Sequence, residues 1–193
     1  MTEPTPTTET GGNPCAELFR YFALFFRGET HEGWFDAWPS VGGTIEALAS
    51  GEEAVPAPAL APDEVAKSFA KLFYGVSPVT IPLAESCWFN VGHLYCQTET
   101  LATREAYRAE GLTLGDAVTL PEDHLGISLE FVAVLLDAGK TEKAQAFVKE
   151  HIATWWSKAC ETISMREESA SIAPVLKAFS TLLSDFSNWL AED

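Results

Sequence analysis

Three residue types of a hydrolytic triad fall within one short segment: Asp123, His124 and Ser128. In such triads a carboxylate orients a histidine, and the histidine takes the proton of a serine nucleophile. Asp123 and His124 are adjacent, however, and neighbours on a helix point about 100° apart, so they do not orient one another as a catalytic pair. Ser128 is within reach of His124, but the segment Gly126–Glu130 lacks the second glycine of a nucleophile elbow. The pattern therefore predicts no catalytic residue.

Metal and nucleotide sites have equally little support. The histidines at 31, 93, 124 and 151 show none of the short spacings of metal ligands, and the four cysteines contain no Cys-x-x-Cys pair. Neither a GxGxxG nor a GxxxxGK[ST] phosphate loop occurs. Cysteines so widely spaced argue against a disulfide framework and favour reduced thiols. We therefore predict no metal, no cofactor and a cytoplasmic location.

The residues around Asp123 also have a structural explanation. Thr119 and Glu122 have the spacing of a capping box, in which each side chain satisfies the backbone amide of the other residue. This predicts a helix beginning there, with Asp123 in its first turn, where the helix dipole favours negative charge. His124 is a polar ring that leads into an apolar helix, so it needs a partner. His151 lies on an apolar stripe and is interpreted as a hydrogen-bonded core histidine.

The chain as a whole is acidic: its 193 residues include 28 Asp and Glu against 12 Lys and Arg, a formal net charge of -16. A nucleic-acid-binding protein needs a basic face, so that class is excluded and a cationic partner is favoured. Residues 1–13, rich in Thr, Pro and Glu, predict a disordered tail without the basic start of an export signal. The apolar run Leu18–Phe26 is about half as long as a membrane-spanning helix and predicts a buried one.

Helical periodicity covers most of the remaining sequence. Asn13-Pro14 and Gly28 are typical of the two ends of a helix, and the proline- and alanine-rich segment 51–62 predicts a connecting loop. Hydrophobic residues make up 47% of the chain, enough for a sizeable core. We predict an all-α, single-domain helical bundle over residues 14–193. The expected helices cover residues 14–27, 33–39, 43–50, 63–76, 101–110, 121–139, 144–159 and 172–190.

Five short segments carry a further signal, because they follow one another in a familiar order. They are FAKLFYG at 69–75, ESCW at 85–88, RxxYxxxGL at 104–112, PEDH at 121–124 and HIxxW at 151–155. In this order they resemble the motifs of the TorD/DmsD family of cytoplasmic chaperones for molybdoenzymes. The similarity extends from about residue 65 to residue 190.

The resemblance implies an all-α fold of the TorD-like type without catalytic activity. It also implies a function: the chain binds the twin-arginine leader and the apo form of a molybdopterin-containing oxidoreductase, aids cofactor insertion and delays export until then. The leader-binding residues carried over from the matching motifs are Phe69, Leu72, Phe73, Trp88, Pro121, Asp123 and His124.

The chemistry of such a leader is compatible with these residues. Two guanidiniums followed by an apolar stretch require carboxylates beside an aromatic-lined surface. We expect Asp123 to supply charge or to orient His124, whereas the four apolar residues fit either a groove or the core. Two alternatives stay open: a helical interaction or assembly factor without leader specificity, and an enzyme that uses Asp123 and His124. The identity of the client, a bound nucleotide and a homodimer formed by helix exchange at the 51–62 loop also stay open.

Overall fold

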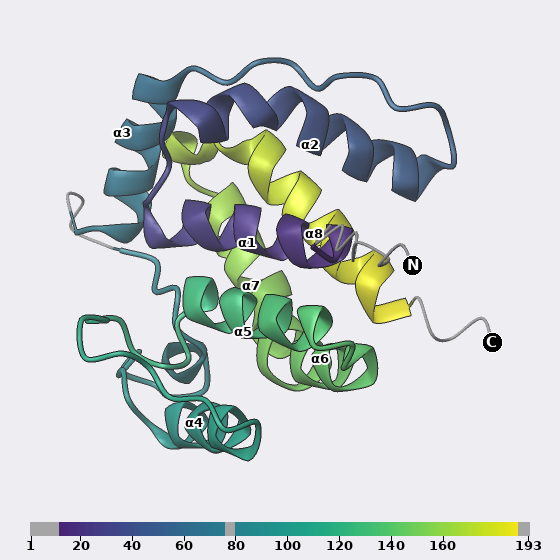
Figure 1. Cartoon of the computed structure of the whole chain (residues 1–193). Helices are drawn as coiled ribbons and strands as arrows, with labels where there is room; N and C mark the ends of the chain where they lie inside the picture. Colours follow the sequence, from purple (N-terminus) through teal and green to yellow (C-terminus); the bar gives the residue numbers. More distant parts are fainter. Residues whose placement is uncertain (1–11, 76–79, 189–193) are drawn as a thin grey trace, which may run out of the picture.

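The computed structural model describes residues 12–75 and 80–188, and Figure 1 shows their arrangement. Within these ranges the chain is helical and contains no strand, which confirms the predicted all-α class. The α-helices are α1 Pro14–Arg27, α2 Glu32–Ser50, α3 Pro62–Phe73, α4 Thr98–Ala109, α5 Leu125–Asp137, α6 Thr141–Phe147, α7 Ala153–Ser164 and α8 Ala173–Asn188. The shorter helical segments are η1 Glu85–Trp88, the π-helical η2 Val148–Ile152 and η3 Glu167–Ser169. The predicted tail over residues 1–11, and Val76 and Leu190 of the predicted helices, lie outside the described residues.

Helix α1 begins and ends where the sequence predicts. The side chain of Asn13 accepts hydrogen bonds from the amides of Cys15 and Ala16, and Pro14 occupies the first turn, where a missing N–H costs nothing. Gly28 closes the helix at a φ of 71°, a left-handed conformation that glycine adopts without strain. In Figure 1, α1 lies between α2 and α5.

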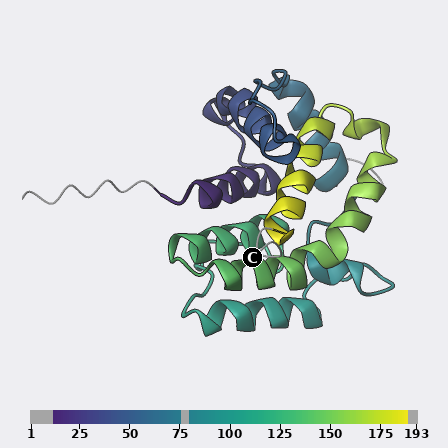
Figure 2. The same cartoon turned by 90° about the vertical axis from the view of Figure 1, so that its right-hand side faces the viewer.

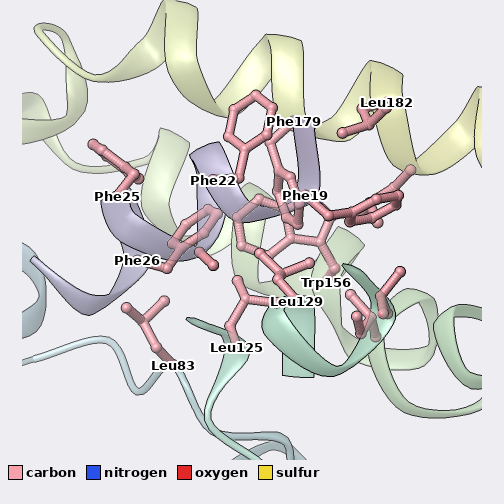
Figure 3. Close-up of a cluster of buried hydrophobic side chains, with 14 of the residues drawn as sticks. Phe19, Phe22, Phe25, Phe26, Leu83, Leu125, Leu129, Trp156, Phe179 and Leu182 are labelled. Carbon is pink, nitrogen blue, oxygen red and sulfur yellow. The ribbon is translucent and has the colours of Figure 1, made fainter. Parts of the chain in front are cut away.

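The core is built around the aromatic face of α1. Figure 3 shows Phe22 and Phe26 directed toward Phe179 of α8, and the ring centroids of Phe26 and Phe179 lie 4.9 Å apart. Phe26 also packs edge-on against Trp156 of α7 at 5.4 Å. Burying each of these rings contributes roughly 1.5–3 kcal/mol. Leu129 of α5 closes the cluster from the opposite side, so one core joins four helices.

Residues 33–39 and 43–50 are helical as predicted, but they belong to one continuous helix, α2, so the break expected between them is wrong. Pro39 lies inside it, although an internal proline removes a backbone hydrogen bond. Trp34, Trp38 and Ile45 are buried along its inner face, so tertiary packing outweighs the local cost of the proline.

The connection between α2 and α3, residues 51–61, forms no helix and runs back along α2. The indole Nε1 of Trp38 donates to the carbonyl of Pro58 at 3.0 Å. The loop backbone passes so close to Gly43 that any side chain there would collide with it. The loop is therefore anchored to α2, and Pro62, which the sequence placed in the loop, is the first residue of α3.

Residues 85–124 leave the bundle and return to it at one point. Ala84 and His124 form an isolated antiparallel bridge, and the amide of Leu125 donates to the carbonyl of Leu83 at 2.7 Å. This segment, the 85–124 excursion, contains η1 and α4. Figures 1 and 2 both show α4 on the outer side of α5 and α6. No helix within the described ranges is long and apolar enough to cross a membrane.

The most extensive helix–helix contact in the described part of the chain is between α1 and α5. Gly126, in the first turn of α5, lies directly against the last turn of α1. A Cβ atom at position 126 would lie 2.5 Å from Cγ of Arg27 and 3.0 Å from the carbonyl oxygen of Ala23. The absence of a side chain therefore lets the end of α1 and the start of α5 lie side by side.

Gly126→Ala should lower the free energy of unfolding by about 1–3 kcal/mol, because the added methyl group forces α1 and α5 apart. Urea denaturation measures this change. Gly115→Ala is the matched control, since a Cβ atom at position 115 meets nothing within 4 Å. Equal losses in the two variants would show that the helices do not need this close approach.

Candidate functional site

Asp123 connects the segment before α5 to η1. Its Oδ2 accepts a hydrogen bond from the amide of Ser86 at 2.7 Å, and its backbone carbonyl accepts one from the amide of Glu85 at 3.1 Å. The residue is 1% exposed, and its Oδ1 has no hydrogen-bond partner among the described residues. Asp123 precedes α5 instead of lying in its first turn. Its carboxylate therefore does not interact with the start of α5 as expected, but holds η1 in place through Ser86.

His124 is the N-cap residue of α5. Its Nδ1 accepts a hydrogen bond from the amide of Gly126 at 3.2 Å, which requires that this nitrogen carry no proton. Burial lowers the pKa of His124 to about 4; the charge of Asp123 opposes this shift, and the guanidinium of Arg27 adds to it. At neutral pH the ring is therefore an uncharged capping group.

The helix start expected at Thr119 is wrong. Helix α5 begins at Leu125, Thr119 is exposed, and the carboxylate of Glu122 accepts from Nε of Arg104 at 2.6 Å. This hydrogen bond lowers the pKa of Glu122 below its ordinary value. The hydroxyl of Tyr107 donates to the backbone carbonyl of Glu122 at 2.7 Å. Contacts with α4 therefore replace the local capping box.

No catalytic triad forms around His124. The contact with Ser128 is made by the backbone, since the Ser128 amide donates to the His124 carbonyl at 2.9 Å. Asp123 is bonded to Ser86 instead of to the imidazole. Over residues 12–75 and 80–188, no group of three or more His, Cys, Asp or Glu side chains is placed to hold a metal ion.

His151 lies in the π-helical turn η2, between α6 and α7. Its Nδ1 is 2.9 Å from Oε2 of the buried Glu85, and Oγ1 of Thr103 is 3.4 Å from both atoms. The interpretation of His151 as a hydrogen-bonded core histidine is confirmed. Burial raises the pKa of Glu85 above its ordinary value, and His151 partly offsets this effect. Glu85 was not predicted as the partner of His151, although the two residues belong to the ESCW and HIxxW segments.

Three of the apolar residues expected at the leader contact belong to the core. Leu72 has no exposed surface, and Phe69 packs edge-on against Phe25 with ring centroids 5.5 Å apart. Trp88 stacks on Trp155 at 6.0 Å and is 9% exposed. A groove formed by these three side chains is therefore not present in the structure.

The remaining predicted residues fall into two groups. Phe73 is half-buried on α3, where its ring packs against Phe69 at 4.9 Å. Pro121, also half-buried, lies just before α5 together with the inward-facing Asp123 and His124. The structure brings the PEDH residues together at the start of α5 and places the FAKLF residues on α3, so the seven side chains do not line one groove.

A cleft of about 460 Å³ opens beside the PEDH segment, between α1, α5 and the loop 112–120. We call it the α1–α5 cleft. Its apolar lining includes Leu112, Leu114, Val118, Leu120, Ile127 and Phe131. The charged lining residues are Arg27, Glu29 and Glu130, and the side chains of the two glutamates are 54% and 42% exposed. The cleft could not be predicted from the sequence, because its walls come from segments about one hundred residues apart.

An ion-pair network runs along the boundary between α1 and α5. Its members are Glu17, Arg20, Arg27, Glu29, Glu130 and Asp137. Nη2 of Arg27 is 2.8 Å from Oε2 of Glu29, and Nη1 is 3.4 Å from Oε2 of Glu130. Four carboxylates thus share two guanidiniums, and the network has a net charge of -2.

Residues 42–161, more than half of the chain, match the family model described as nitrate reductase delta subunit. The chain belongs to this family. Nitrate reductase delta subunit proteins are chaperones of the NarJ and TorD type, so the resemblance of the sequence motifs is confirmed. As a member of this family the chain is a maturation chaperone for a redox enzyme and not itself a catalyst.

A solved structure has the same fold. A protein from Archaeoglobus fulgidus, described as a candidate redox enzyme maturation protein, superposes with a TM-score of 0.55 at 17% sequence identity. The similarity covers 97% of this chain and 99% of that protein. At this identity the match shows the fold alone, and the shared fold includes α1 and α8, which lie outside residues 42–161.

Asp123→Ala should destabilise the protein by about 1–3 kcal/mol, because it leaves the buried amide of Ser86 without an acceptor. Chemical denaturation measures the loss. Asp116→Ala, at an exposed position of the loop 112–120, is the control. If both variants unfold at the same urea concentration, the carboxylate of Asp123 has no structural role.

The stability of the protein should fall with acidification through His124. Its pKa in the folded protein, about 4, is below the ordinary value, so the unfolded chain binds this proton first. The stabilisation is present above about pH 6.5 and is lost toward pH 4, a change of roughly 3 kcal/mol. His124→Asn keeps a capping oxygen and does not titrate. The stability difference between wild type and this variant should shrink or reverse between pH 7 and pH 4, and parallel pH profiles would contradict the assignment.

Proposed function

We propose that the protein is a cytoplasmic chaperone that binds the twin-arginine leader and apo form of a molybdopterin-containing oxidoreductase. Retention of the leader delays export of this client until its cofactor is inserted. Membership of the nitrate reductase delta subunit family, together with the PEDH, ESCW and HIxxW segments, supports the choice of this ligand. It assigns a ligand to a protein whose sequence offers no catalytic or metal-binding pattern.

The α1–α5 cleft is the observation that carries this proposal. An arginine-bearing leader has guanidiniums beside an apolar stretch, and the cleft has carboxylates beside an apolar wall. Glu29 and Glu130 are both partly exposed, so a guanidinium can reach them from solvent. Leu114 and Val118, on the loop that forms the outer wall, offer apolar contact. The acidic charge of the whole chain attracts such a cationic segment over a longer distance.

The residues expected from the sequence take different parts in this proposal. Pro121 directly follows Leu120, which lines the cleft, so Pro121 is close enough to contact a bound leader. Asp123 and His124 fix the start of α5, and so position Glu130 two turns of the helix farther on. Phe69, Leu72, Phe73 and Trp88 support the surrounding helices through the core instead of forming the groove.

The protein should bind a twin-arginine leader peptide more tightly than its Lys-Lys counterpart by about tenfold. A guanidinium presents several donors in a planar fork that matches a carboxylate, whereas an ammonium presents a point charge. Isothermal titration calorimetry with the two peptides at moderate salt measures the ratio.

Equal affinity for both peptides would favour a helical assembly factor without leader specificity. Absence of binding to either peptide would contradict leader recognition altogether. A peptide in which the two arginines are replaced by glutamine is the control for apolar binding alone, and it should bind more weakly than both.

A further inference from the structure

Arg27 is held in the α1–α5 cleft in the way a ligand arginine would be held. It is the last residue of α1, its Cγ lies next to Gly126 of α5, and its side chain is only 16% exposed. Both Nε and Nη2 of the guanidinium are bonded to Oε2 of Glu29, at 3.0 and 2.8 Å. The cleft therefore already contains one guanidinium, supplied by the protein itself.

Glu130 is less well satisfied than Glu29. Its two oxygens lie 3.4 Å from Nη1 of Arg27 and 3.5 Å from Nε of Arg20, whereas charge-assisted hydrogen bonds are about 2.7–2.9 Å long. Both arginines have a shorter contact elsewhere: Arg27 with Glu29, and Arg20 with Glu17. Glu130 is thus a partly exposed carboxylate that two cations approach and neither binds closely.

We propose that Glu130 is an arginine receptor on which Arg27 acts as an internal stand-in for an arginine of the client. In the free protein Arg27 is shared between Glu29 and Glu130. A client guanidinium binds by taking the place of Arg27 on Glu130, while Arg27 keeps its closer partner Glu29. The inference rests on the proposed leader binding and adds that Arg27 competes with the leader for Glu130, which limits the affinity of the protein for the leader.

Charge complementarity favours an arginine-bearing partner over other occupants of this cleft. The surrounding network has a net charge of -2, so it accepts two positive charges before it becomes neutral. A second copy of this chain has a formal net charge of -16, so it would be repelled by the negative charge of the network. The apolar wall next to Glu130, including Ile127 and Phe131, is suited to uncharged side chains adjacent to the arginines.

The competition gives Arg27 and Glu130 opposite effects on binding. Glu130→Gln should weaken binding of the twin-arginine peptide by about tenfold, because it removes the acceptor charge. Arg27→Gln should strengthen it by about threefold, because the variant retains much of the aliphatic stem and removes the Arg27 charge from both Glu29 and Glu130. Neither variant should change binding of the Gln-Gln peptide.

The experiment titrates the twin-arginine and Gln-Gln peptides into wild type, Arg27→Gln, Glu130→Gln and the control Glu46→Gln. Glu46 lies on α2, is 70% exposed and pairs with Lys177, so its replacement changes the net charge equally without touching the cleft. Thermal unfolding of each variant checks that the fold is intact. If Glu130→Gln does not fold, Glu29→Gln replaces it, and a loss of binding is expected there too, because Arg27 then returns to Glu130.

Opposite shifts in Arg27→Gln and Glu130→Gln, with no shift in Glu46→Gln, support the proposal. Weaker binding in Arg27→Gln, or equal losses in Glu130→Gln and Glu46→Gln, would overturn it while leaving leader binding intact. No binding of the twin-arginine peptide by wild type would overturn leader binding itself, and the arginine receptor with it.

Discussion

The close contact between α1 and α5 is the constraint on which the rest of the structure depends. It exists because position 126 has no side chain, so that the backbone at Ala23 and the stem of Arg27 can occupy that space. Once the two helices touch there, the phenylalanines of α1 face the core, and His124 comes under the influence of the Arg27 charge. The cleft residue Glu130 also reaches α1 only because of this approach.

Much of the fold follows from local sequence signals. The ends of α1 were predictable because Asn13, Pro14 and Gly28 act on the backbone of their own neighbours. The split of α2 was wrong because a proline is a local signal, whereas the burial of Trp34 and Trp38 that outweighs it depends on other helices. Boundaries set by tertiary packing are not visible in a single sequence.

The sequence predicted the PEDH segment next to the cleft, but neither the cleft itself nor the direction of the PEDH side chains. The order of the motifs identified the PEDH segment, and residue types indicated carboxylate, imidazole and apolar contacts. The direction of each side chain depends on distant partners: Asp123 is bonded to a residue 37 positions away, and Glu122 to one 18 positions away. Spacing along the chain cannot reveal such partners. The apparent capping box was replaced by contacts with α4, and the apparent groove by core contacts with α1 and α7.

That excursion begins and ends at the bridge between Ala84 and His124, on the outer side of the bundle. Its two ends are held together by backbone hydrogen bonds, one of them from Leu125 to Leu83. A change in the number of residues between α4 and the PEDH segment alters only the size of a closed loop, and the entropy of loop closure grows slowly with length. The loop 112–120 can therefore lengthen or shorten in evolution without displacing α5. One wall of the cleft can thus change in length while the opposite wall, on α1 and α5, stays the same.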